Sequence, residues 1–163
     1  MINMKKEFYN CRGKSVETDE WVYGSAFFIG NKGYILTVPS NQRAKKVIEN
    51  LGDYATEVDT KTVARCIGVN DTASMPVFEE DIIRENVEYD RELETGDVLE
   101  CYYVIKWVEK YNSYLAIPFE DGKLFKNLHL FLDSLYAIRQ NSFYVVGNVH
   151  DNDLNEYKCK CKE

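Results

Sequence analysis

The chain has little of what marks membrane-spanning, secreted or disordered proteins. No apolar run approaches the roughly eighteen residues of a membrane-spanning helix, and none follows the N-terminal lysines as in a signal peptide. Only three prolines occur among 163 residues, which argues against a Pro-rich, disordered chain. The five cysteines are odd in number, and without a secretory signal they indicate reduced thiols. We therefore expect a soluble protein of the cytoplasm.

The short motifs that identify common enzyme classes are also absent from the sequence. It has no nucleophile elbow, phosphate-binding loop, dinucleotide fingerprint or HExxH motif. The two histidines, His129 and His150, stand outside any such pattern. Cys159 and Cys161 are spaced more closely than the cysteines of a usual structural zinc site. We therefore expect no enzymatic activity, no metal and no cofactor.

Negative charge is concentrated in the middle of the chain. The net charge is −7, yet residues 71–100 contain eleven acidic residues and two arginines, a net charge of −9. Such a segment repels nucleic-acid phosphates and attracts basic partners, although a solvated loop is the plainer interpretation. Residues 84–96 are acidic and almost without apolar side chains, which predicts a loop or insertion. A flexible tail is expected at residues 155–163.

Runs of β-branched and aromatic residues predict strands along much of the chain. No β-α-β rhythm is present, which argues against a doubly wound nucleotide-binding fold. The predicted strands, grouped as two hairpins, one separate strand and a closing strand, are residues 21–38, 97–117, 56–69 and 143–149.

Helical spacing of apolar residues is clearest at residues 124–138, and a shorter helix is expected at residues 41–51. Strands in this arrangement with a late helix predict a mainly β fold. We expect an antiparallel, bent sheet or a small barrel, of the SH3-like kind, with one or two helices packed on it. At this length a single domain over residues 1–163 is expected.

Several short motifs follow one another in a definite order. They are Arg12-Gly13, Trp21-x-Tyr23-Gly24, Val58-Asp59-x-x-Thr62-Val63, Gly68-Val69-x-Asp71, Phe78-Glu79-Glu80-Asp81-Ile82-Ile83, a hairpin with Val104, Lys106, Trp107, Tyr114 and Ile117, and Gly147-Asn148-x-x-Asp151-Asn152-x-Leu154. In order and spacing they resemble the YopX-like proteins of phages and prophages. The resemblance implies a phage or prophage origin and a shared architecture, and it carries no activity with it.

Three positions depart from the pattern of that family. Ile67 replaces its usual Thr, while Ser74 and Glu80 stand where the family has Gly. A glycine in such a turn supplies a positive φ angle. Glu80 therefore sits either in an ordinary turn or in a strained one.

The acidic triplet Glu79-Glu80-Asp81 is the cluster that invites a catalytic or metal-binding hypothesis. A hydrolytic site needs a further acid or histidine, and neither histidine has a matching motif around it. The plainer interpretation is that Glu79 and Asp81 organise a turn, the Asp through hydrogen bonds to backbone amides.

The aromatic residues of the second hairpin allow two interpretations. Tyr102, Trp107 and Tyr114 could stack on single-stranded nucleic acid. Packing in a core or an interface is the commoner role of such residues in strands.

These patterns favour a non-enzymatic phage or prophage accessory protein that binds a host or phage macromolecule in the bacterial cytoplasm, with a protein partner favoured over nucleic acid. One alternative is a small β-barrel that binds nucleic acid through the aromatic hairpin and residues 43–46. Another is an acidic decoy that acts through residues 79–100. Self-association through β edges is also expected, and no membrane attachment. The candidate binding residues are Tyr102, Trp107, Tyr114, Glu79 and Asp81.

Overall fold

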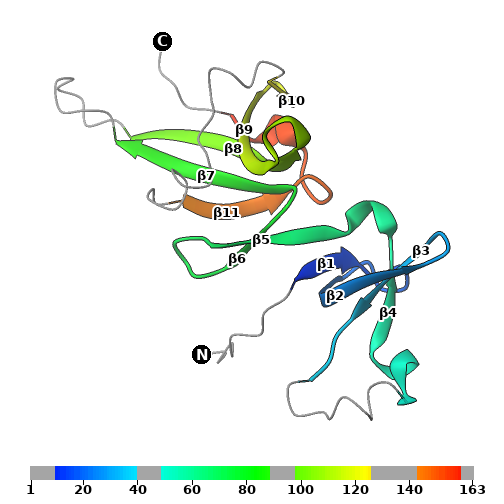
Figure 1. Ribbon diagram of the computed structural model, residues 1–163. Coiled ribbons are helices and arrows are strands. Elements are labelled where there is room, and N and C mark those ends of the chain that lie inside the picture. Colours follow the sequence, from blue (N-terminus) through cyan, green and yellow to red (C-terminus); the bar gives the residue numbers. More distant parts are fainter. Residues whose placement is uncertain (1–9, 40–48, 89–97, 126–142, 159–163) are drawn as a thin grey trace. The chain divides into compact units, whose positions relative to one another are not determined.

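The fold is given by a computed structural model that describes residues 10–39, 49–88, 98–125 and 143–158 (Figure 1). The chain divides into two compact units, Met1–Cys66 (unit 1) and Ile67–Glu163 (unit 2). In the described ranges the strands form two open sheets, and the helical elements with described bounds are 3-10 turns of three residues. The prediction of a mainly antiparallel β protein is confirmed, with open sheets instead of a closed barrel. The single-domain prediction stays a prediction, because compact units occur both within one domain and in separate domains.

Unit 1 is a sheet in which β1 lies between β2 and the start of β5. The predicted hairpin at residues 21–38 is confirmed by the antiparallel pairing of β2 with β3. Gly30 takes a φ of 61° in its turn, a conformation that glycine adopts without strain. The strands, in the sheet order β4-β3-β2-β1-β5, are β1 (Cys11–Lys14), β2 (Trp21–Ile29), β3 (Lys32–Leu36), β4 (Ala55–Val58) and β5 (Ala64–Asn70).

The prediction of one strand over residues 56–69 is wrong, because a 3-10 turn, Thr60–Thr62, separates β4 from β5. The Asp59 carboxylate accepts a hydrogen bond from the Lys61 amide at 3.0 Å. The Thr62 hydroxyl donates to the Asp59 carbonyl at 2.8 Å. Such local bonds offer the backbone an alternative to the hydrogen bonds of a sheet. The alternation of apolar residues, on which the strand prediction is based, contains no information about these bonds.

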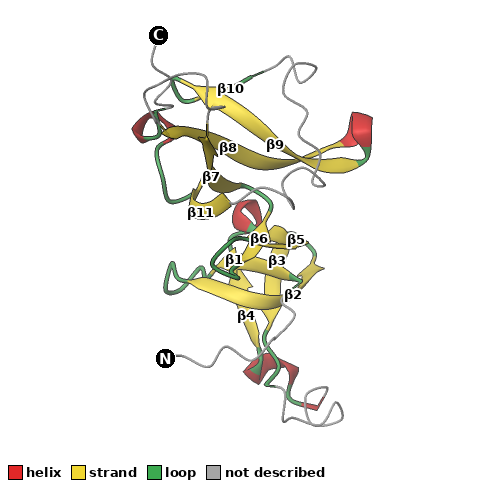
Figure 2. Cartoon of the chain, turned by 90° about the vertical axis from the view of Figure 1, so that its left-hand side faces the viewer, coloured by secondary structure: helices red, strands yellow, loops and turns green. Residues whose placement is uncertain are grey.

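Unit 2 is built on a sheet with the order β10-β9-β8-β7-β11. The second predicted hairpin is confirmed by the pairing of β8 with β9, and the closing strand by β11 on β7 (Figure 2). Asn112 ends the turn of this hairpin with a φ of 47°. The strands of this sheet are β7 (Asp81–Glu88), β8 (Val98–Val108), β9 (Ser113–Glu120), β10 (Lys123–Leu124) and β11 (Phe143–Asn148). The short strand β6 (Pro76–Phe78) pairs instead with β5, as the last strand of the first sheet.

The prediction of a loop at residues 84–96 is wrong for its first part. Strand β7 continues to Glu88, which pairs with Val98 at the start of β8. Arg84 and Glu100 form an ion pair of 3.6 Å across the two strands. Backbone hydrogen bonds and cross-strand pairs hold a hairpin arm that has few apolar residues. Residues 89–96 lie outside the described residues.

The helix predictions fall mostly outside the described residues. Of the helix predicted at residues 124–138, residues 126–138 lie outside the described residues. Of the helix predicted at residues 41–51, residues 41–48 lie outside them. Leu51–Asp53 forms a 3-10 turn. The tail predicted from residue 155 begins within another 3-10 turn, Leu154–Glu156, and residues 159–163 lie outside the described residues.

Apolar side chains lie on both faces of the unit 2 sheet. Ile83 and Ile105 belong to one buried cluster, whereas Ile82 and Val104 belong to another. Neighbouring residues of a strand point to opposite faces, so the two clusters mark the two sides. The second cluster packs against the segment that follows β11, including Leu154 and Tyr157.

Candidate functional site

Glu80 occupies the turn between β6 and β7 in a strained conformation, with a φ of 69°. Its amide donates to the carbonyl of Ile105 at 2.7 Å, and its carbonyl accepts from the amide of Val149 at 3.1 Å. A left-handed conformation costs a residue with a side chain roughly 1–2 kcal/mol. Of the two turn alternatives, the strained one is therefore present. Ser74, at the other glycine position, also has a positive φ, of 66°.

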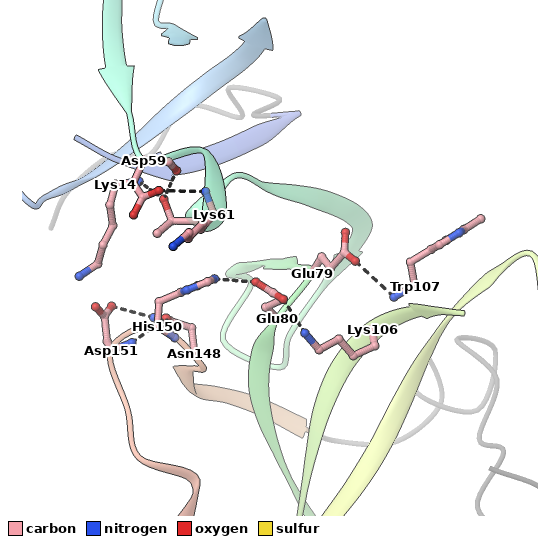
Figure 3. Close-up of polar contacts among 11 residues, drawn as sticks. Lys14, Asp59, Lys61, Glu79, Glu80, Lys106, Trp107, Asn148, His150 and Asp151 are labelled. Atoms are coloured by element: carbon pink, nitrogen blue, oxygen red, sulfur yellow. Dashed lines mark hydrogen bonds and ion pairs between the residues drawn. The ribbon is translucent and has the colours of Figure 1, made fainter. Parts of the chain in front are cut away.

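The Glu80 carboxylate lies between two basic side chains (Figure 3). Lys106 Nζ lies 2.5 Å from Oε1, and His150 Nε2 lies 2.5 Å from Oε2. Burial by itself would raise the pKa of Glu80, but the hydrogen bonds and charges of Lys106 and His150 outweigh it and hold the pKa below its ordinary value. These three residues, the Glu80 clasp, join the β6–β7 turn, β8 and the turn after β11.

The turn that carries His150 is shaped by Asn148, which is buried. The Asn148 side-chain oxygen accepts from the amides of His150 and Asp151 at 2.9 and 3.1 Å. Its side-chain nitrogen donates to the Asp151 carboxylate at 2.8 Å. Asn152 in turn accepts from the Asn148 amide at 3.0 Å. The closing motif of the chain therefore positions His150 against Glu80.

The chemistry open to the clasp follows from how its atoms are used. Both oxygens of Glu80 bind basic groups, so this carboxylate is not placed as a general base. The clasp instead ties the segment after β11 to the sheet. The Lys106–Glu80 ion pair is partly shielded from water, so salt screens it less than it screens an exposed pair.

Two of the predicted site residues, Glu79 and Asp81, are directed at backbone amides. Asp81 is only 1% exposed, and its carboxylate accepts from the Phe78 amide at 2.8 Å. The Glu79 carboxylate accepts from the Trp107 amide at 3.4 Å (Figure 3). These contacts are the ones expected if Glu79 and Asp81 organise a turn by binding backbone amides.

The predicted aromatic residues separate into two places. Trp107 and Tyr114 are cross-strand partners, with ring centroids 5.0 Å apart in an edge-to-face arrangement. Tyr102 lies an odd number of positions from Trp107 on β8 and therefore points to the opposite face. There its ring packs against Tyr157 at 5.4 Å. The hairpin thus brings two of the three residues together.

Asp71 has an equivalent structural role at the end of β5. Its two carboxylate oxygens accept from the amides of Met75 and Val145, at 2.8 and 3.1 Å. The first bond closes the turn that contains Ser74, and the second reaches β11. Asp71 is buried, and its contacts account for its place in the motif.

The motif residues of unit 1 also have structural roles. The Arg12 guanidinium lies 4.4 Å from the centre of the Trp21 ring. A Cβ atom at Gly24 would lie 2.2 Å from the carbonyl oxygen of Leu36, so only glycine permits this approach of β2 to β3. Thr62 accepts from the Lys14 amide at 2.8 Å, which ties the 3-10 turn to β1.

The sequence analysis missed the partnership of Glu80 with Lys106 and His150. An acidic residue at a position that favours glycine was the available signal, because such a residue is kept there by its side chain. Nothing in the sequence identified the partners, which lie 26 and 70 positions away.

Other expectations concern metals, membranes and the basic segment. In the described ranges, no three residues among His, Cys, Asp and Glu gather as a metal site would require. The same ranges hold no helix long and apolar enough to cross a membrane. Cys159, Cys161 and residues 43–46 lie outside the described residues.

Comparison with known proteins gives one match. The family model described as YopX protein matches residues 10–154, which include parts of both compact units. No curated protein and no solved structure matches the chain.

Proposed function

The chain belongs to the YopX family, and from this premise we propose that it is a non-enzymatic phage or prophage accessory protein that binds another protein in the cytoplasm of the bacterial host. The observation that carries the proposal is Trp107, which is 41% exposed on the β8–β9 hairpin. Trp and Tyr are enriched among the residues that dominate binding energy at protein interfaces.

The Trp107 ring is held in place before any partner arrives. Tyr114 packs edge-to-face against it. Tyr114 is itself partly buried against the apolar cluster of unit 2 that contains Ile83 and Ile105. At the hairpin turn, the Lys110 ammonium lies 5.2 Å from the centre of the Tyr111 ring. A fixed aromatic surface loses little side-chain entropy on binding. We call these four residues the Trp107 surface.

A protein partner fits the charges around this surface better than nucleic acid does. Stacking platforms for single strands combine aromatic rings with basic neighbours that contact phosphates. Here Lys106 is bound to Glu80, and the Glu79 carboxylate lies beside the Trp107 amide. These carboxylates offset the positive charge that phosphate binding requires.

The roles of the motif residues support a function without catalysis. Asp71, Asp81 and Asn148 use their side chains to bind backbone amides. Residues with these roles fix turns, and they account for the motifs without a reaction.

The test is affinity capture from host lysate, with and without nuclease, using the wild type and Trp107→Ala. We expect a partner that survives nuclease and is lost with Trp107→Ala. Phe28→Ala is the matched control, because Phe28 is 57% exposed in unit 1 and its truncation should leave capture unchanged. Sedimentation of the purified protein shows whether a second copy of the chain is the partner.

Two results would contradict the proposal. A partner retained equally by Trp107→Ala would rule out the Trp107 surface. Recovery that disappears with nuclease would instead favour the nucleic-acid alternative, whose affinity should fall steeply with added salt.

A further inference from the structure

A pocket of about 580 Å³ in unit 2 lies where β8 and β9 meet the segment after β11. Aromatic rings and two carboxylates contribute to its lining. These residues are Tyr102, Phe119, Phe125, Tyr157, Glu120 and Asp121. None of them belongs to the Glu80 clasp or to the Trp107 surface.

The aromatic wall of the pocket is a packed cluster. The Tyr157 ring meets Tyr102 and Phe119 edge-on, with centroid distances of 5.4 and 6.4 Å. Tyr102 donates its hydroxyl hydrogen to Glu100, and Tyr157 donates to the carbonyl of Val146. Burial and the neighbouring Glu100 raise the pKa of Tyr102, and burial and Glu156 raise the pKa of Tyr157, so both rings stay neutral phenols at physiological pH. The ring orientations are thus fixed by packing and by hydrogen bonds.

Two glycines allow the pocket walls to come together. A Cβ atom at Gly147 would lie 2.5 Å from the Tyr157 hydroxyl oxygen. One at Gly122 would lie 2.7 Å from the side-chain oxygen of Asn155. The segment after β11 therefore fits closely against the sheet and the β9–β10 turn. The pocket has built walls and is not a gap between mobile loops.

The charged residues that line the pocket are two acids and one lysine. Glu120 and Asp121 are both exposed, and within the described residues neither carboxylate takes part in a hydrogen bond or an ion pair. Lys158 also lines the pocket, so acids exceed bases by one among the lining residues. Lys123 lies across from Glu120 on the neighbouring strand β10. The net charge of −7 adds a general attraction for positively charged partners.

We propose that this pocket binds the guanidinium or ammonium side chain of a basic segment in a partner protein. Aromatic faces attract cations through the ring quadrupole, and carboxylates at the rim strengthen that attraction. An anionic side chain would meet repulsion at Glu120 and Asp121. The proposal is independent of the Trp107 surface, because the pocket lining and that surface have no residue in common.

The probe is a capped pentapeptide with two arginines and three glycines, measured by isothermal calorimetry on the full chain. A peptide with citrulline in place of arginine has the same shape without the charge. We expect the citrulline peptide to bind roughly tenfold more weakly. We also expect added salt to weaken binding of the arginine peptide, because the rim is exposed.

Variants locate the binding in the pocket. Glu120→Gln combined with Asp121→Asn should weaken arginine-peptide binding roughly three- to tenfold. Asn tolerates the positive φ of 47° at position 121, so the turn is preserved. Glu17→Gln with Glu20→Gln is the matched control, because it removes the same charge from exposed positions in unit 1.

The aromatic wall is tested at Tyr157. Tyr157→Leu removes one ring of the wall and should reduce the difference between the arginine and citrulline peptides. Tyr157→Phe keeps the ring and should retain that difference, which separates the loss of the ring from the loss of the hydroxyl bond to Val146.

Equal affinity for the two peptides, absence of binding, or unchanged affinity in the Glu120/Asp121 variant would overturn the proposal. Tetramethylammonium binding as tightly as the arginine peptide would also overturn it, in favour of a small organic cation. Trp107→Ala should leave peptide binding unchanged, so failure here is distinguishable from failure of the Trp107 surface.

Discussion

At Glu80 two requirements meet in a single residue. The backbone angle favours glycine, whereas the bonds to Lys106 and His150 require a carboxylate. The carboxylate bonds compensate for the strain, because they tie two distant segments to the turn. This explains how a position that usually needs glycine accepts an acid.

Substitutions at Glu80 separate the backbone from the side chain. Glu80→Ala removes the ion pairs and keeps the strain, whereas Glu80→Gly removes both. We expect Glu80→Ala to be the less stable of the two by roughly 1 kcal/mol. Urea unfolding of both variants measures the difference. An alanine variant as stable as the glycine variant would show that the turn relaxes away from the positive φ.

The Glu80 carboxylate also predicts a pH dependence of stability. Its pKa is lower in the folded protein than its ordinary value of 4.5. Its contribution to the free energy of unfolding is therefore fully present above that value and is lost as the pH falls through the folded-state pKa. We expect Glu80→Gln to lower stability at neutral pH and to flatten the loss of stability between neutral pH and the acid range below pH 4.5. The measurement is urea unfolding across this range, with exposed Glu17→Gln as the control; parallel curves for Glu80→Gln and the wild type would contradict the prediction.

At the scale of elements, the sequence identified strands where alternation and β-branched residues dominate. The β2–β3 and β8–β9 hairpins and the closing strand β11 are of this kind. The strand predictions failed where local polar hydrogen bonds determine the backbone conformation, as at Asp59. They also failed where a strand has mostly polar residues, as in the last part of β7. At the candidate site, the turn role of Asp81 was foreseen because an aspartate binds nearby amides. The Glu80 clasp was not, since its partners come from remote strands.

The 3-10 turn before β5 depends on Thr62. Its hydroxyl donates to the Asp59 carbonyl and accepts from the Lys14 amide. Thr62→Val keeps the shape and leaves a part-buried amide without its partner, so we expect a loss of roughly 1–3 kcal/mol in the free energy of unfolding.

Denaturant unfolding and hydrogen exchange at the Lys14 amide measure this effect. Thr60→Val, at an exposed position of the same turn, is the matched control. An unchanged exchange rate at Lys14 in Thr62→Val would show that the hydroxyl does not protect this amide.

At the scale of the whole molecule, the family motifs are shared between the two compact units. Arg12, Trp21 and Thr62 belong to unit 1, while Asp71, Glu80 and Asn148 belong to unit 2. β5 runs through the boundary: Ala64 pairs with β1 in unit 1, and Val69 belongs to the apolar cluster of unit 2. Loss of this strand would remove pairing from one unit and core from the other.

This continuity predicts that the units unfold together, as the expected single domain would. The two tryptophans of the chain report on them separately, since Trp21 lies in unit 1 and Trp107 in unit 2. We expect Trp21→Phe and Trp107→Phe, each with one remaining tryptophan, to give coincident fluorescence transitions in urea. Adding Thr62→Val to each single-tryptophan variant should then lower the urea midpoint reported by Trp107 as far as the midpoint reported by Trp21. A shift confined to Trp21 would show that unit 1 unfolds by itself, and the chain would then consist of two domains joined within β5.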